Sequence, residues 1–178
     1  KDVTHVIVDN SVTIIKARVF HNSVTVNQLS AFYYCRSLVS VIMGDNVKRI
    51  EKKAFCDCQA LRCVRLSKTL EHIGIYAFCK CLSMEALVLP STLKSIGNMA
   101  FMFCESLRLL NLSNFILDIS NIGDEIIHFT AIHQIANTVG VEYEEDYEEL
   151  GGGSFTYRGS TDESNRQVNE WLIHHMDE

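Results

Sequence analysis

The stretch Ala77-Phe78-Cys79-Lys80-Cys81 carries the pattern Ala-Phe-x-x-Cys, which decides the fold because it recurs at a fixed interval of 23 residues. The equivalent alanines are Ala31, Ala54, Ala77 and Ala100, the phenylalanines are Phe32, Phe55, Phe78 and Phe101, and the cysteines are Cys35, Cys58, Cys81 and Cys104. An ordinary globular core does not require such regularity. A stack of similar coils does require it, because each buried position lies directly above its counterpart in the next coil.

Each unit has a strand-like half and a turn-like half. Leu61, Val64 and Leu66 end in period-two alternation, which is typical of a short strand. One coil supplies one strand, so we expect neighbouring strands to pair in parallel. The step Ile73-Gly74 indicates a turn followed by a short helical or 3₁₀ segment on the outer side. Here the alanine permits close approach, and we expect the phenylalanine ring to fill the interior.

Together these positions resemble the BspA-like, or Treponema-type, leucine-rich repeats. The unit of that family reads Leu-x-x-Val/Ile-x-Leu-Pro-x-x-Leu-x-x-Ile-Gly-x-x-Ala-Phe-x-x-Cys. The match runs from about Val3 to Ile119, and the proline after the strand survives only at Pro90. The resemblance implies an α/β repeat fold: a leucine-rich-repeat solenoid with a short-stranded parallel sheet on the concave face and turns or short 3₁₀ segments on the convex face.

The two ends of the array depart from the repeat. We expect residues 1–140 to form the solenoid, with an irregular first unit and a degenerate last coil. In the first unit Phe20 lies only 12 residues before Phe32, so about half a coil is absent between them. After Leu112 the period slips, and the template continues with a shift of three residues. Terminal repeats are commonly atypical because they close the core.

Residues 141–159 are predicted to be an acidic and Gly-rich connector. The acidic run Glu142–Glu149 is either a solvated loop or a docking strip for a basic partner. The three glycines at residues 151–153 are not followed by a helix that carries a lysine, so they favour a flexible connector over a phosphate-binding loop.

Residues 160–178 are predicted to form a C-terminal amphipathic helix. Ser160 and Glu163 have the spacing of a capping box, and Trp171 and Leu172 fall on one helical face. An isolated helix of this length is marginally stable in water, so we expect it to dock on the solenoid. The alternative is that the helix presents Trp171 to a partner.

Composition excludes several classes of protein. The chain has 178 residues, of which 47% are hydrophobic and 21% charged, which indicates a globular protein. A net charge of −6 does not favour a nucleic-acid partner. No apolar stretch reaches the length of about 18 residues that a membrane span requires.

Seven cysteines allow several interpretations, because an odd number leaves at least one thiol unpaired. In the repeated position small buried thiols are explained by packing, although the spacing of adjacent coils does not exclude disulfides. Cys56-x-Cys58 lacks the gap of two to four residues that is typical of zinc sites, so we expect no metal. Unpaired cysteines favour a reducing, intracellular compartment, with the cell surface as the alternative.

Enzyme motifs are absent from the sequence. There is no Gly-x-Ser-x-Gly, no phosphate-binding loop and no His-Glu-x-x-His, and the seven histidines are scattered. We therefore expect a protein that is not an enzyme and that uses no cofactor.

The candidate site is the concave face, because the stacked strands of a solenoid present a continuous binding surface there. Side chains that alternate with the buried strand positions are predicted to form the partner-binding surface, and they are Ile7, Ile42, Cys63, Arg65, Val88, Leu109 and Asn111. This row is more apolar than a solvated sheet face, and an arginine among apolar side chains suits an interface hot spot.

We therefore predict a recognition or scaffold module that binds another protein. Cover of this face by the tail, or self-association, is the alternative. The resemblance adds a second function, an extracellular adhesion domain that binds host or matrix proteins.

Overall fold

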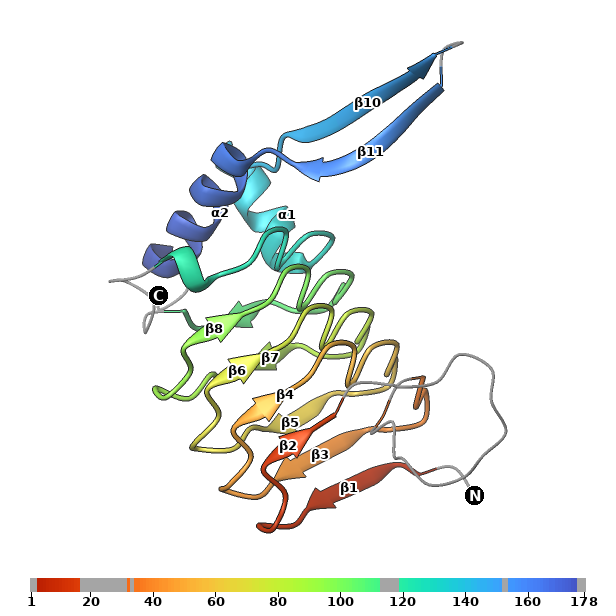
Figure 1. The fold of residues 1–178 in the computed structure, drawn as a ribbon, viewed down its shortest axis with the longest axis vertical. Coiled ribbons are helices and arrows are strands. Elements are labelled where there is room, and N and C mark those ends of the chain that lie inside the picture. The colour runs from red at the N-terminus through yellow and green to blue at the C-terminus, as the bar shows by residue number, and fades with distance from the viewer. Residues whose placement is uncertain (1–2, 17–31, 33, 113–118, 152–153, 176–178) are drawn as a thin grey trace.

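The computed structural model describes residues 3–16, 32, 34–112, 119–151 and 154–175. Successive coils stack along the long axis of the molecule, and two helices and a hairpin lie beyond the last coil (Figure 1). The short stretch between Phe20 and Phe32, where half a coil is absent from the repeat, falls almost entirely outside the described residues.

The first sheet takes one short strand from each coil. Its strands are β1 (His5–Val8), β3 (Ser40–Met43), β5 (Cys63–Arg65), β7 (Ala86–Leu87) and β9 (Leu109–Leu110). They pair in parallel in two ladders, β1-β3-β5 and β7-β9, which confirms the predicted parallel stacking. Along each strand more exposed and less exposed residues alternate, so one face joins the core and the other faces outward.

A second parallel sheet was not predicted from the sequence. It consists of two-residue strands, namely β2 (Ile14–Ile15), β4 (Arg49–Ile50), β6 (His72–Ile73) and β8 (Ser95–Ile96). A parallel bridge between Ile96 and Ile122 continues it into the last coil. The predicted turn at the Ile-Gly step therefore begins one residue later, because the isoleucine itself pairs with its counterpart in the next coil.

The glycine after this isoleucine allows adjacent coils to approach. A Cβ atom on Gly97 would lie 2.5 Å from the backbone nitrogen of Ile75, and one on Gly74 would lie 2.6 Å from the backbone of Lys52. Real Cβ atoms do not approach backbone so closely. The repeated Ile-Gly step is therefore a steric requirement of stacking.

Gly97→Ala is expected to lower the free energy of unfolding by about 1–3 kcal/mol, the usual cost of overpacking a tight interior. The added methyl group meets backbone rather than a flexible side chain, so the two coils must move apart to accommodate it. Urea denaturation followed by circular dichroism measures the change. An unchanged urea midpoint would show that the contact between these coils is not tight.

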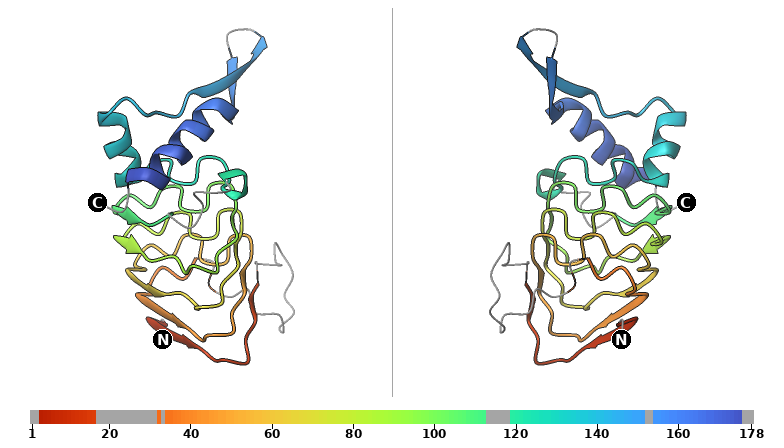
Figure 2. Two further views of the ribbon diagram at one scale, coloured as in Figure 1. Left: turned by 90° about the vertical axis from the view of Figure 1, so that its left-hand side faces the viewer. Right: turned by 90° about the vertical axis from the view of Figure 1, so that its right-hand side faces the viewer.

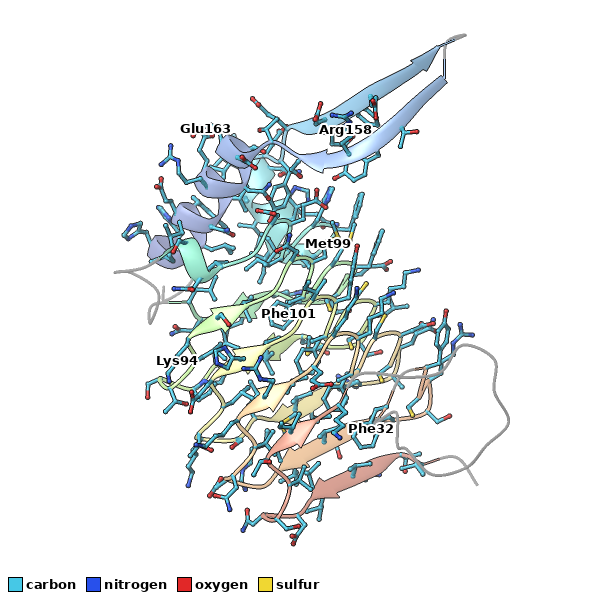
Figure 3. The ribbon with its side chains drawn as sticks, in the orientation of Figure 1. Phe32, Lys94, Met99, Phe101, Arg158 and Glu163 are labelled. Atoms are coloured by element: carbon cyan, nitrogen blue, oxygen red, sulfur yellow. The ribbon has the colours of Figure 1, made fainter. Side chains whose placement is uncertain are left out.

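The core is a set of columns that run through the coils. The rings of Phe32, Phe55, Phe78 and Phe101 stack nearly parallel, with centroid distances of 5.1, 5.2 and 5.8 Å between neighbours. Figure 3 labels Phe32 and Phe101, which lie at the two ends of this stack. The predicted interior position of the rings is confirmed for the three that are fully buried, Phe55, Phe78 and Phe101.

The repeated cysteines form a second column and a specific hydrogen bond. The thiol of Cys81 donates to the carbonyl of Phe55 at 3.3 Å, and that of Cys104 donates to the carbonyl of Phe78 at 3.1 Å. Each thiol is free and fully buried. A cysteine in this position fills a small space and also satisfies a carbonyl of the preceding coil.

The last coil repeats the template with an offset of three residues. Phe78 donates its N–H to the carbonyl of Ala100, whereas Phe101, one unit later, donates to the carbonyl of Ile126. Ile126 and Ile127 thus occupy the alanine and phenylalanine positions, and both are fully buried. A 3₁₀ turn, η2 (Ile119–Asn121), precedes this coil, and helix α1 (Ala131–Thr138) follows it.

Residues predicted to be a flexible connector instead form an antiparallel hairpin. Strand β10 (Glu145–Gly151) pairs with β11 (Ser154–Ser160). An ion pair of 2.7 Å between Arg158 and Glu148 and a contact between the rings of Tyr147 and Tyr157 join the strands. These cross-strand pairs stabilise the β conformation that the acidic run adopts from Glu145 onward. The hairpin projects from the helical end of the molecule (Figure 2).

Helix α2 (Asp162–His175) follows the hairpin, but its predicted capping box is wrong in detail. Thr161, not Ser160, accepts the N–H of Ser164 at 3.2 Å. Ser160 instead donates to Glu125. On the inner face of the helix Leu172 is fully buried in the core, whereas Trp171 is half-buried against it and stacks on His175.

Candidate functional site

The outward face of the first sheet carries the residues predicted for the concave surface. Ile7 and Val88 are 79% and 74% exposed, and Ile42, Leu109 and Cys63 are also exposed. Asn111 is half-buried. The strand register aligns Ile7 with Ile42, and Ile42 with Arg65, so three of the predicted residues form a column across β1, β3 and β5.

The second ladder holds the rest of this surface, which we call the sheet face. Leu109 pairs with Ala86, and Val88 and Asn111 lie one residue beyond strands β7 and β9. No ladder joins β5 to β7 in the described part of the chain. The structure therefore brings the predicted residues onto one side of the solenoid in two groups.

Charged side chains border the apolar residues of the sheet face. The guanidinium of Arg65 lies 3.2 Å from the carboxylate of Asp45, and the ammonium of Lys68 lies 3.5 Å from the same carboxylate. A further ion pair of 2.8 Å joins Arg62 to Glu85. Because these pairs are exposed, each contributes about 1 kcal/mol or less to stability. Arg65 is thus neutralised by a neighbour, which the sequence pattern did not indicate.

A groove of about 530 Å³ lies between the turn segments and the hairpin, and sequence analysis did not predict it. One wall is formed by residues that recur in successive coils, such as Tyr76 and Met99, and the hairpin contributes Tyr157 and Arg158 to the other. Figure 3 shows Arg158 on the hairpin above Met99 on the coil. The signal in the sequence was the 23-residue spacing of these residues outside the core.

The backbone explains why the side chains of the turn segments line this groove. Each turn contains two residues with positive φ, four positions apart, such as Tyr76 at 55° and Lys80 at 61°. Non-glycine residues seldom adopt this left-handed conformation. The next coil repeats it at Met99 and Phe103, so the side chains are arranged in columns.

In each of these columns a lysine lies beside an aromatic ring of the next coil. The ammonium of Lys53 lies 5.4 Å from the centre of the Tyr76 ring, and that of Lys80 lies 5.6 Å from the centre of the Phe103 ring. Such cation–π contacts contribute about 0.5–1 kcal/mol at exposed sites. The groove therefore has a positively charged, aromatic wall.

Two thiols also line the groove. Cys56 and Cys79 occupy equivalent positions in adjacent coils, and each lies two residues before a core cysteine. Interaction with the neighbouring thiol of Cys79 lowers the pKa of the Cys56 thiol, against the opposing effect of burial, and Lys53 and Lys80 lower it further.

A buried carboxylate joins the hairpin and helix α2 to the last coil. Glu125 is only 1% exposed, and one of its oxygens accepts hydrogen bonds from the hydroxyl of Tyr157 at 2.6 Å and from the N–H and hydroxyl of Ser160 at 2.6 and 2.8 Å. Its other oxygen lies 3.5 Å from Nδ1 of His128. The N–H of Glu125 donates to Asn165 of α2 at 2.9 Å.

The pKa of Glu125 is lowered to about 2 by this network. Burial alone would raise the pKa, but hydrogen bonds from His128, Tyr157 and Ser160 to the ionised form outweigh burial. Nearby, burial and the charge of His128 lower the pKa of His133 to about 4. Strongly shifted groups often mark active sites, but this carboxylate is enclosed and fully engaged, so its role is structural.

The described residues contain no group of three or more histidine, cysteine, aspartate or glutamate side chains that could hold a metal ion. In each Cys-x-Cys pair the first cysteine lines the groove and the second lies in the core.

In the described part of the chain, no helix is long and apolar enough to cross a membrane.

Two parallel sheets, stacked aromatic rings and a constant unit length define a leucine-rich-repeat solenoid. The sequence model of the protein family described as BspA type Leucine rich repeat region matches residues 28–157 in six copies. The chain belongs to this family. Leucine-rich repeat proteins typically take part in protein–protein interactions and are generally non-catalytic.

Solved structures of similar proteins support the same fold. A leucine-rich repeat protein of T. pallidum is 29% identical with a TM-score of 0.50, and the match covers 71% of this chain and 48% of that one. A leucine-rich repeat protein of Bacteroides ovatus ATCC 8483 is 30% identical with a TM-score of 0.57, over 73% of this chain and 36% of that one.

A third similar structure is a leucine rich cell surface protein of Faecalibacterium prausnitzii A2-165. It is 26% identical with a TM-score of 0.55, and the match covers 64% of this chain and 27% of that one. The present chain thus corresponds to less than half of each of these three solved proteins. No curated protein matches the chain.

Proposed function

We propose that this chain is a non-catalytic recognition module that binds another protein through the sheet face. The observation that carries the proposal is the exposure of large apolar side chains on the strands or directly after them, above all Ile7 and Val88. Exposed apolar patches bordered by polar residues mark interaction sites. Ile42 and Leu109 extend the apolar surface over four of the strands or their ends.

The charges around these residues favour a folded protein as the partner. Protein interfaces have an apolar centre and a polar rim, and the ion pairs of Arg65 with Asp45 and of Arg62 with Glu85 supply such a rim. Both charges are present in each pair, so the rim selects neither an acidic nor a basic partner by itself. Shape and apolar contact then account for most of the affinity.

Val88→Glu is expected to weaken binding to the partner at least tenfold, which corresponds to about 1.4 kcal/mol. The added carboxylate would have to lose its water in the apolar centre of the interface. The measurement is photo-crosslinking in a cell extract with a crosslinking residue at position 42. Adducts with a partner protein should form when this chain keeps Val88, and they should be lost when it also carries Val88→Glu.

Val139→Glu is the matched control, because Val139 is 62% exposed and lies after helix α1, away from the sheet face. Its adducts should equal those of the wild-type chain. Equal adducts from Val88→Glu and Val139→Glu would refute binding through the sheet face. If the crosslinked species is instead a second copy of the chain, and Val88→Glu abolishes a dimer in sedimentation, the face is a self-association surface.

A second candidate function is adhesion at a cell surface. The observation that favours it is the similarity to the leucine rich cell surface protein of F. prausnitzii. Binding to an immobilised extracellular-matrix extract distinguishes this function from a scaffold. The wild-type chain should be retained on the matrix and Val88→Glu should not be, whereas a scaffold would show no retention of either.

A further inference from the structure

Cys56 and Cys79 differ from the other paired cysteines of the solenoid. They are 8% and 5% exposed and line the groove beneath the hairpin, whereas Cys58 and Cys81 are completely buried. The buried pair also donates its thiols to backbone carbonyls of the preceding coil. Both pairs have the same spacing of 23 residues. Of the two pairs, only the groove pair is accessible to a small reactant, because only its thiols line the groove.

The two thiols of the groove pair have different chemical characters. The interaction between these neighbouring thiols is the largest cause of the lowered pKa of Cys56 and of the strongly raised pKa of Cys79. Burial opposes the lowering, as does the charge of Asp57, and the ammonium groups of Lys53 and Lys80 favour it. Cys56 is also the more exposed of the two thiols, so it is the better nucleophile.

The stacking of the coils places these residues at a distance that a disulfide can span. The N–H of Asp57 donates to the carbonyl of Cys79 at 2.8 Å, so the two coils are hydrogen-bonded at this point. Beside these cysteines the rings of Phe55 and Phe78 lie 5.2 Å apart, which gives the spacing of the two coils. Disulfides join residues whose Cα atoms are about 4.4–6.8 Å apart, so the bond requires little movement of the backbone.

We propose that Cys56 and Cys79 are a redox modification site, at which a hydroperoxide that enters the groove oxidises the two thiols to a disulfide. The Cys56 thiolate attacks one peroxide oxygen, so an S–O bond forms, the O–O bond breaks, and the other oxygen leaves as water or an alcohol after protonation. The Cys79 sulfur then attacks the Cys56 sulfur. The S–S bond forms, the S–O bond breaks, and water leaves with the Cys79 proton. Two thiols lose two electrons, and the peroxide gains them.

Trypsin separates the two possible pairs, which makes the test direct. Cys56 and Cys58 share the peptide 54–62, whereas Cys79 lies in 69–80 and Cys81 in 81–94. The fully reduced intact chain is treated with graded hydrogen peroxide, alkylated with iodoacetamide and mapped without reduction. The expected first product is peptide 54–62 linked to 69–80, with fragmentation placing the bond at Cys56.

Single substitutions test the two roles. Cys79→Ser should abolish the linked peptide and leave Cys56 as a sulfenic acid that dimedone traps. Cys56→Ser should abolish both products, and Cys81→Ser, in the buried column, should leave the linked peptide unchanged. The melting temperature of each reduced variant shows that it is folded.

Three results would overturn the proposal. One is a first linkage of 54–62 to 81–94, which would mean that the buried pair reacts. Another is oxidation confined to the exposed Cys63 of the sheet face, with intermolecular dimers as its product. The third is an absence of thiol loss in the folded chain at peroxide levels that oxidise the unfolded one. None of these results bears on binding through the sheet face.

Discussion

Phe78→Ala is expected to lower the free energy of unfolding by about 3–5 kcal/mol, the usual range for removing a buried phenylalanine ring. Phe78 is completely buried and stacks on Phe55 at 5.2 Å and on Phe101 at 5.8 Å. The cavity therefore opens both contacts between coils at once. Because the stability of a solenoid is a sum of units and interfaces, the loss in the middle is not confined to one repeat. Equilibrium denaturation in urea measures it.

Phe32→Ala is the matched control, because Phe32 is half-buried and, within the described part of the chain, stacks on a single ring, that of Phe55. It should cost clearly less than Phe78→Ala. If both variants lost the same free energy, the continuity of the ring column would not be a source of stability.

Glu125→Gln is expected to lower the free energy of unfolding by about 3 kcal/mol at pH 7, and the loss should vanish towards pH 2. The pKa of Glu125 is about 2 in the folded chain, against 4.5 ordinarily. Both states are ionised at neutral pH, so the full stabilisation is present above about pH 4.5. As the pH falls, the unfolded chain binds the proton first, and the stabilisation is lost until about pH 2 is reached.

The measurement is urea denaturation at intervals between pH 7 and pH 2 for the two proteins. Glu148→Gln is the control, because Glu148 pairs with Arg158 on the exposed hairpin and should cost about 1 kcal/mol or less. Parallel stability curves for Glu125→Gln and the wild-type chain across the acid range would contradict the assignment.

His133 causes a separate loss of stability in acid, which should be visible in the curves of both proteins. Its pKa is lowered from 6.5 to about 4, so the folded state keeps the imidazole neutral while the unfolded chain binds a proton. Stability is then complete above about pH 6.5 and decreases as the pH falls to about 4. Because His133 stays buried in Glu125→Gln, the curve of this variant should keep the loss of stability caused by His133. It should lack only the loss at lower pH that Glu125 causes.

The repeating part of the fold was predictable because its signal is redundant. The alanine, phenylalanine and cysteine positions recur together, and any one of them alone would have been weak evidence. Their stacking confirms the α/β repeat class and the parallel strands. The exposed residues of the sheet face, such as Val88, follow from the alternation of side chains along a strand.

The second sheet and the hairpin were missed for physical reasons. Two-residue strands such as β6 are too short to show period-two alternation, and they persist because the next coil supplies their partners. In the hairpin, β10 is dominated by acidic residues, which are weak strand formers. Its conformation depends on pairing with β11, and the anchor at Glu125 lies 35 residues from Ser160. No local pattern reports such a contact.

The groove was missed because its walls come from different parts of the chain. Its repeating wall was present in the sequence as the 23-residue spacing of Tyr76, Met99 and their equivalents, but that spacing does not show what lies opposite them. The other wall, with Arg158, exists only because the hairpin is held over the last coil. A repeat pattern predicts what recurs, and it does not predict what folds back onto it.

The three-residue offset of the last coil has a consequence for how such a protein can evolve. The polar anchors of the hairpin and of α2, at Glu125 and Gly123, belong to that coil. Duplication or deletion of an internal 23-residue unit would therefore change the length of the array and leave these anchors untouched. Descendants of one ancestor can thus differ widely in the number of coils while they inherit the same closed terminus.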